Sequence, residues 1–212
     1  MRPSSTPTAT PSTCKPVNYP LTLSFKVVAL APQIYVTDAD GQTICYVKQK
    51  LLKLKEQVEV FRDQSRTEKV AHIQANKVID WSARYNFTDP AGNELGSVGR
   101  RGLRSMWKAH YDVFNPGDQH ADFSIQEENP WAKIGDSVLG GIPILGFFTG
   151  YFIHPSYLAS RADGTPAMRL KKLPAFWEGK FNIEKLTDLT PNEELNLLLS
   201  FLMLNLLERR RG

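Results

Sequence analysis

The stretch of this chain that most constrains its fold is the last one, Thr190 to Arg209. It opens with the residues that start α-helices. Thr190 is a suitable N-cap, Pro191 suits the first helical position, and Glu193 is placed to complete a capping box. The pattern therefore predicts a helix over about residues 190–209.

The interior of this predicted helix is apolar on almost every side. Its sequence is LNLLLSFLMLNLL, and a helix of this kind must be enclosed by protein or by lipid. The run would span only about 20 Å, against about 30 Å of bilayer hydrocarbon. Asn196 and Asn205 also lie within it. We therefore expect a central helix that the rest of the chain encloses.

The sequence before the helix predicts a polar leader followed by a single β-domain. Residues 1–18 begin MRPSSTPTATPSTCKP, which predicts a disordered leader and contains no apolar core of a signal peptide. Residues 19–212 are expected to form a single domain. Cys14 and Cys45 are the only cysteines, which argues against a disulfide framework and favours a cytoplasmic location.

Short apolar and β-branched segments, separated by turn residues, fill residues 21–185. Strands are predicted at 21–30, 33–38, 42–48, 58–60, 69–76, 83–88, 94–100, 107–114, 122–127, 151–159, 167–172 and 179–185. The fold class predicted is mainly β, a closed antiparallel barrel of about twelve strands that encloses the hydrophobic C-terminal helix.

A hairpin pattern occurs three times within these strands. Each copy has an aromatic residue near the start of a strand, an acidic turn ending in Gly, a second strand and then a basic pair. The copies start at Tyr35, Tyr85 and Tyr157. Their spacing along the chain is irregular, so we expect repeated hairpins inside one closed sheet.

The order of barrel and helix resembles the Tubby C-terminal-like superfamily, and most of all the bacterial LURP-one-related and phospholipid scramblase-like proteins. The segments that carry the resemblance are VTDADGQTICYVKQKLLKLKEQVEVF, GNELGSVGRRGLRSMWKAHYDV, GYFIHPSYLASRADGTPAMRLKKLPAFWEGKFNIEKL and the final helix. Together they span about residues 20–209. The resemblance implies a twelve-stranded barrel around a central helix. Some members of the superfamily bind phosphoinositides, and others are associated with lipid scrambling.

Basic residues follow the second strand of each repeated hairpin, and we expect them to gather at one rim of the barrel. They form a candidate site for an anionic headgroup, since Lys and Arg side chains bind phosphate oxygens. The alternative is that charged strand ends only keep the sheet from pairing with other sheets. The candidate residues are Lys48, Lys50, Arg100, Arg101, Arg104, Lys171 and Lys172.

An uncharged segment, residues 138–153, is a candidate membrane-contact loop. Its glycines and Pro143 interrupt any helix, and it is too short to span a bilayer. The alternative is a buried loop that leads into a core strand. The candidate contact residues are Trp131, Ile142, Ile144, Leu145, Phe147 and Phe148.

The sequence lacks the motifs of catalysis and of cofactor binding. No nucleophile elbow, phosphate-binding loop or dinucleotide fingerprint occurs, and the four histidines show no metal-ligand spacing. We therefore expect no enzyme activity, no catalytic residue, no metal and no cofactor. Scramblases are associated with a calcium segment beside the final helix, but Asp188, Glu193 and Glu194 do not match it.

The net charge of +4 is compatible with an anionic partner but does not name one. We expect a non-enzymatic binding module for anionic phospholipid or another phosphate-bearing ligand, cytoplasmic or peripheral at the inner membrane face. The alternatives are a structural or protein-interaction barrel that meets an acidic protein, and a scramblase-like lipid transporter. Nucleic acid is disfavoured, because the tryptophans form no aromatic–basic binding motif.

Overall fold

The computed structural model describes residues 17–26, 33–48, 58–76, 84–101, 110–128, 155–174 and 179–209. These residues form twelve β-strands and a C-terminal helix. The strands are β1 (Leu21–Lys26), β2 (Gln33–Thr37), β3 (Thr43–Lys48), β4 (Val58–Phe61), β5 (Lys69–Ala75), β6 (Arg84–Thr88), β7 (Glu94–Arg100), β8 (His110–Phe114), β9 (Phe123–Glu127), β10 (Ser156–Arg161), β11 (Pro166–Leu173) and β12 (Gly179–Lys185). The helix is α3 (Pro191–Arg209).

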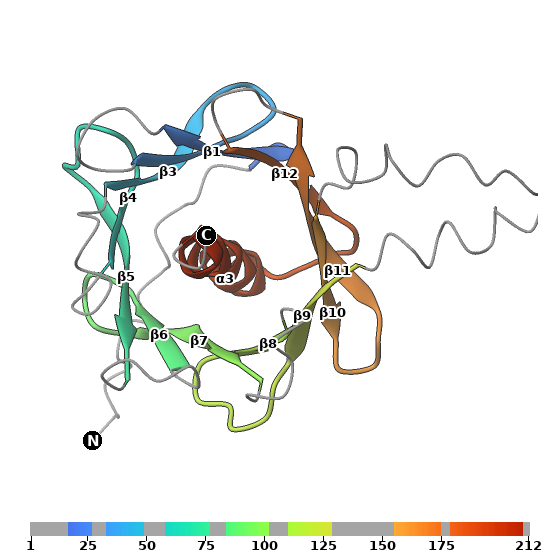
Figure 1. The fold of residues 1–212 in the computed structure, drawn as a ribbon. Helices are drawn as coiled ribbons and strands as arrows, with labels where there is room; N and C mark the ends of the chain where they lie inside the picture. The colour runs from blue at the N-terminus through green and yellow to red at the C-terminus, as the bar shows by residue number, and fades with distance from the viewer. Residues whose placement is uncertain are drawn as a thin grey trace, which may run out of the picture.

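The strands close into one antiparallel barrel (Figure 1). Each strand pairs with its neighbours in the chain, and β1 pairs with β12 over five residue pairs from Leu21↔Ile183 to Phe25↔Gly179. The shortest junction joins β3 to β4, where Tyr46 pairs with Phe61. The predicted closed barrel is confirmed.

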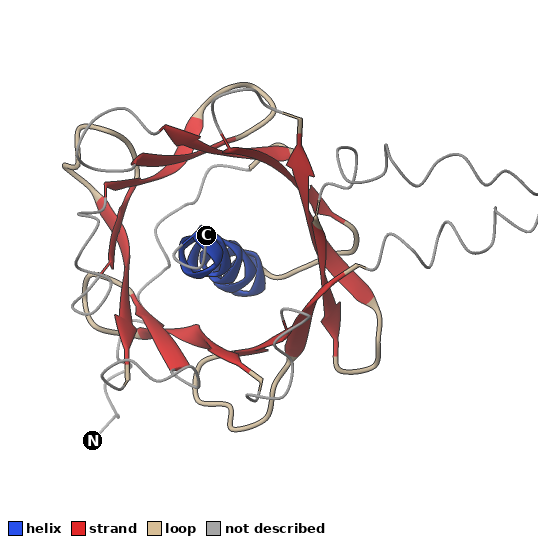
Figure 2. Cartoon of the chain, in the orientation of Figure 1, coloured by secondary structure: helices blue, strands red, loops and turns tan. Residues whose placement is uncertain are grey.

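Helix α3 lies inside the barrel, as predicted (Figure 2). The side chains from Leu197 to Leu206 are all buried, because the inward-facing residues of the strands surround the helix. Two polar side chains in this run bond within the helix. Ser200 Oγ donates to the carbonyl of Asn196 at 2.8 Å, and Asn205 Nδ2 donates to the carbonyl of Phe201 at 2.8 Å.

Helix α3 approaches the wall of the barrel most closely at β7, through Asn196 and Gly96. Asn196 Nδ2 donates to the carbonyl of Phe114 at 2.9 Å and to Asn115 Oδ1 at 3.2 Å. A Cβ atom on Gly96 would lie only 2.4 Å from that same Nδ2. The bare Gly96 backbone, at φ +130°, is therefore what lets the helix bond to the end of β8.

The three repeated hairpins are β2–β3, β6–β7 and β10–β11, and they share one turn geometry. Gly41, Gly92 and Gly164 have φ of 78°, 90° and 88°. Each donates its N–H to the carbonyl three residues earlier, and each pairing shifts register just before its turn. Two strands lie between one copy and the next, so the pattern recurs every four strands around the barrel. The repeat predicted from the sequence is thus a threefold repeat of the barrel wall.

The leading aromatic residues of the copies are not equivalent. Tyr157 belongs to the core around the helix, whereas Tyr35 lies on the outer wall with Tyr46 and Phe61. Ile34 takes the inward position on β2. The cause is spacing: Tyr35 precedes its turn glycine by one residue fewer, and a shift of one residue reverses the face of a strand.

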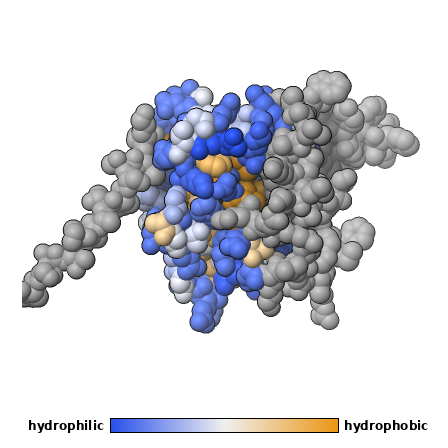
Figure 3. Space-filling model, turned by 90° about the vertical axis from the view of Figure 1, so that its left-hand side faces the viewer, coloured by the Kyte–Doolittle hydropathy of each residue, from blue (hydrophilic) through white to orange (hydrophobic). Residues whose placement is uncertain are grey.

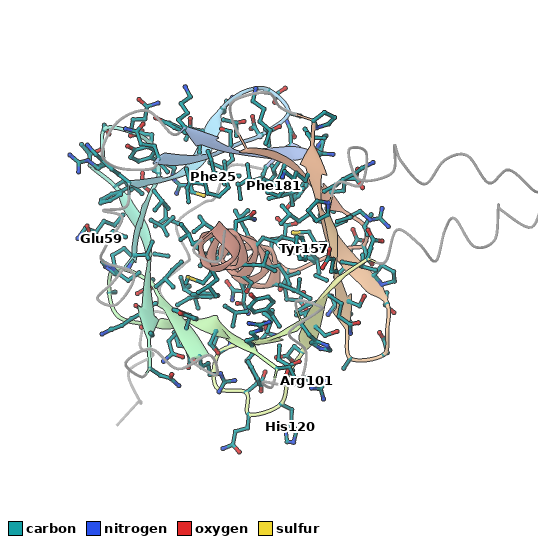
Figure 4. The ribbon with its side chains drawn as sticks, in the orientation of Figure 1. Phe25, Glu59, Arg101, His120, Tyr157 and Phe181 are labelled. Carbon is teal, nitrogen blue, oxygen red and sulfur yellow. The ribbon has the colours of Figure 1, made fainter. Side chains whose placement is uncertain are left out.

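The outward positions of the strands are largely polar. Figure 4 shows Glu59 and Arg101 on the outside of the barrel, whereas Phe25 and Tyr157 face the helix. Phe25 packs edge-on against Phe181, with 6.1 Å between ring centroids. The face that carries β4 and β5 is mostly hydrophilic around a small hydrophobic area (Figure 3).

Candidate functional site

The two ends of the barrel differ in charge. Because neighbouring strands are antiparallel, all odd-numbered strands finish at one end, and all even-numbered strands finish at the other. We call the first the basic end. The second, which carries the hairpin turns at residues 38–42, 62–68, 89–93, 115–122 and 162–165 and the start of α3, is called the turn end.

At the basic end, cations outnumber acids among the described residues. Most of these cations are exposed, and Arg84 and Arg100 are half-buried. The cations are Lys26, Lys48, Arg84, Arg100, Arg101, Lys171, Lys172 and Lys180. The acids are Glu59, Asp112, Glu127 and Glu128.

The described candidates for headgroup binding all lie at this end. Lys48 ends β3, Arg100 ends β7, and Lys171 and Lys172 lie near the end of β11. Three strands separate β3 from β7, β7 from β11, and β11 from β3. The basic residues therefore share one end but occupy separate thirds of the circumference, and they do not form one compact cluster.

The remaining candidates fall outside the described residues. These are Lys50 and Arg104 among the basic residues, and all the residues of the candidate membrane-contact loop, Trp131, Ile142, Ile144, Leu145, Phe147 and Phe148. The leader, residues 1–16, also lies outside them.

Aspartates hold the turns at the turn end. Asp38 Oδ1 accepts the N–H groups of Asp40 and Gln42 at 3.0 and 2.8 Å. Asp89 Oδ1 accepts the N–H of Asn93 at 2.8 Å, and the pKa of Asp89 is lowered chiefly by the hydrogen bond from the Asn93 side chain. The ionised form of the Asp89 carboxylate is favoured, because hydrogen bonds to the charged form stabilise it. The turns thus carry negative charge as part of their structure.

The start of α3 adds further acids to the turn end. Glu193 accepts the N–H of Thr190 at 2.8 Å, and the Glu193 N–H is 3.3 Å from Thr190 Oγ1, which confirms the predicted capping box. Arg161 of β10 binds the same carboxylate, with Nη1 2.6 Å from Oε1 and Nη2 3.3 Å from Oε2. This ion pair lowers the pKa of Glu193. Lys185 and Glu194 form a second pair.

A hollow of about 390 Å³ lies at the turn end, beside this ion pair. Its lining includes Asp118, Asp122 and Asp163 together with His120 and Arg161. Acidic side chains outnumber Arg161 there, so the hollow disfavours an anionic ligand. Among the described ranges, no group of His, Cys, Asp and Glu side chains is arranged to hold a metal ion.

The sequence reasoning missed three cations of the basic end: Lys26, Lys180 and Arg84. Lys26 and Lys180 lie at the ends of the neighbouring strands β1 and β12, outside the repeated hairpins. The position of these cations at strand ends could have identified them from the sequence. In an up-and-down barrel, every residue at the finish of an odd strand or the start of an even strand lies at the same end.

Residues 43–139, which include strands β3 to β9, match the family model described as LURP-one-related. Over these residues the chain is similar to that family. The resemblance expected from the sequence is therefore confirmed for this part of the barrel. Proteins of this family are generally non-enzymatic.

A solved X-ray structure of a protein from Arabidopsis thaliana is similar to the chain at 15% sequence identity and a TM-score of 0.46. The alignment covers 89% of this chain and 90% of that one. No curated protein matches the chain. Among the described residues, no helix is long and apolar enough to cross a bilayer.

Proposed function

We propose that the chain is a non-enzymatic binding module that recognises an anionic, phosphate-bearing ligand at the basic end of the barrel, with a phospholipid headgroup at a membrane surface as the ligand. The observation that supports this is the separation of charge along the barrel. Cations predominate among the described residues of one end, and turn-forming aspartates predominate at the other.

This separation gives the barrel a preferred orientation near an anionic surface. Lys48 and the pair Lys171–Lys172 are exposed on strands four apart, so a flat surface across the barrel end reaches both at once. Each cation near an anionic leaflet contributes about 1 kcal/mol. The turn end is repelled by the same surface. The barrel axis would therefore lie perpendicular to the membrane surface, with the basic end toward the lipid.

Vesicle flotation tests this proposal. Wild-type protein should float with phosphatidylcholine vesicles that contain phosphatidic acid, and should stay in solution with pure phosphatidylcholine. Reversing charge at Lys171 and Lys172 to Glu should weaken binding about tenfold or more, by the contribution expected for surface cations. Arg66→Glu is the matched control, because Arg66 is an exposed cation at the turn end. If the wild-type protein floats with neither kind of vesicle, the proposal is refuted.

An acidic protein is the alternative ligand for the same end. The test separates the two, because a barrel that binds polyglutamate but neither kind of vesicle would be a protein-interaction module. We do not propose lipid scrambling. It would require α3 to leave the barrel, and exposing a buried leucine such as Leu202 or Leu197 costs about 1.5–3 kcal/mol each.

A further inference from the structure

Arg84 is held in an unusual setting on the outer wall of the barrel. It is the first residue of β6, at the basic end, and its guanidinium carbon lies 3.4 Å from the centroid of the Phe114 ring on β8. Between them runs β7, whose Gly99 pairs with Arg84 and presents no side chain. The glycine thus leaves room for the arginine to cross β7 and stack on Phe114.

The stacked guanidinium has two buried nitrogens, Nε and Nη2, without a hydrogen-bond partner among the described residues. These two N–H groups share one edge of the planar group, the edge that fits two oxygens of a carboxylate or a phosphate side by side. Leaving buried donors unpaired is costly, and native proteins rarely do so without a reason.

In two other arginines of the chain, the Nε and Nη2 edge of the guanidinium is hydrogen-bonded to a carboxylate. Arg169 donates from Nε to Glu128 Oε2 at 3.1 Å and from Nη2 to Glu128 Oε1 at 3.3 Å. Arg62 donates from Nε and Nη2 to Glu68 Oε1 at 3.4 and 3.0 Å. Both are bonded to a carboxylate of the chain itself, whereas no carboxylate of the described residues fills the same edge of Arg84.

Asp112, the acid on β8 that lies across β7 from Arg84, does not fill this edge. Asp112 pairs with Gly99 from the side opposite Arg84. Its carboxylate lies 3.7 Å from Arg101 Nε and 3.7 Å from His110 Nε2. Phe114 stacks on the guanidinium plane and Asp112 is paired with Arg101, so no described carboxylate fills the Nε–Nη2 edge of Arg84.

We propose that Arg84 binds, through Nε and Nη2, a phosphate group of the anionic ligand. This inference rests on the proposed function and deepens it by naming the residue that recognises the phosphate. The shared chemistry is a phosphate monoester, whether it belongs to a lipid headgroup or to a soluble molecule. Arg84 supplies two directed hydrogen bonds, and the lysines elsewhere at the basic end supply charge without direction.

Arg84→Lys is the decisive variant, because it keeps the positive charge and removes the two-pronged edge. Binding to vesicles of phosphatidylcholine with phosphatidic acid should weaken by roughly tenfold to a hundredfold. Arg66→Lys is the matched control: it makes the same chemical change at an exposed position of the turn end, and its binding should stay within about twofold of wild type. Phe114→Leu, which removes the stacking platform, should weaken binding in the same direction as Arg84→Lys.

A measurement on the wild type covers the case in which Arg84→Lys does not fold. In protein labelled with ¹⁵N at arginine Nε, the Arg84 Nε–H resonance should shift when phosphate monoester is added. The Arg169 resonance should not shift, because Glu128 already occupies that edge. Glycerol 3-phosphate separates the two sources of phosphate. A shift with it in a protein that does not float with phosphatidic acid vesicles identifies a soluble ligand, and a shift only with phosphatidic acid identifies a lipid.

The outcomes distinguish this inference from the proposed function. If folded Arg84→Lys binds vesicles as the wild type does, or the Arg84 resonance stays in place while the wild type binds, Arg84 is not the phosphate-recognition residue and the proposed function survives. If the wild type binds neither vesicles nor soluble phosphate monoester, both fall.

Discussion

Replacing Gly96 by Ala tests whether the helix is fixed to the barrel by a close contact between backbone and side chain. The new Cβ would lie 2.4 Å from Asn196 Nδ2 and 2.6 Å from its Cγ and Oδ1. Asn196 is fully buried and bonds to the end of β8, so it cannot move aside without losing those hydrogen bonds.

The expected loss has two parts. A side chain at φ +130° costs about 1–3 kcal/mol, and overpacking a core costs about 1–3 kcal/mol more. Disturbing the buried amide adds to this, so we expect about 3–6 kcal/mol out of the roughly 5–15 kcal/mol that stabilise a domain. Gly41→Ala isolates the backbone part, because φ is +78° there and nothing lies within 4 Å. It should cost about 1–2 kcal/mol.

Urea unfolding of the variants, followed by circular dichroism, measures these free energies. Gly99→Ala is a second control on the same strand, since its Cβ would make an ordinary contact, 3.7 Å from Arg84 Cγ. It should change stability by no more than about 0.5 kcal/mol. In an Asn196→Ala background, Gly96→Ala should cost only its backbone part. A Gly96→Ala protein as stable as Gly41→Ala, or an unchanged cost in the Asn196→Ala background, would refute the close-contact argument.

Three further predictions concern the helix and the core. The Arg161 ion pair lowers the pKa of Glu193, so the Glu193 carboxylate stabilises the fold at pH values above the ordinary pKa of Glu. This stabilisation is lost as the pH falls through the lowered pKa of Glu193. In urea unfolding at a series of pH values, the stability of Glu193→Gln should therefore depend less on acid than that of the wild type. Burial raises the pKa of the Cys45 thiol to about 12, so in a Cys14→Ser protein an alkylating reagent at neutral pH should label Cys45 only as fast as the barrel unfolds, and rapid labelling of folded protein would contradict its burial. Leu202→Ala, at a fully buried position of α3, should cost about 2–5 kcal/mol in the same unfolding assay, and a loss below about 1 kcal/mol would argue that the helix is not enclosed.

Patterns local in sequence predicted most of this fold. The all-round apolar run after Pro191 and the turn glycines were enough to place the helix inside a closed sheet, because each has few structural solutions. Local patterns failed to predict which face of a strand a residue occupies, because a difference of one residue in spacing from the turn reverses the face. Tyr35 was grouped with Tyr157 because each is an aromatic residue before an acidic turn that ends in Gly, but the two side chains face opposite sides of the wall.

The candidate site was less predictable than the fold. The shared end of the basic residues follows from strand direction, which a sequence read as an up-and-down barrel already implies. The environment of Arg84 does not follow from strand direction. It depends on Gly99 and Phe114, which lie on two other strands, and on Asp112 being engaged by Arg101. No residue of that group is conspicuous in the sequence, and their relation appears only when three strands are aligned in register.

The pairing of the first strand with the last also governs how the chain can be made. During synthesis, β1 is the first of the strands to emerge, but its partner β12 and the leucines that fill the axis are translated only after all the other strands. Until then the nascent sheet has open edges and an unfilled hydrophobic interior, which is the state in which β-proteins aggregate. A ribosome that stalls before Gly179 would therefore release a chain that needs a chaperone, because the barrel closes only after β12 and α3 have been translated.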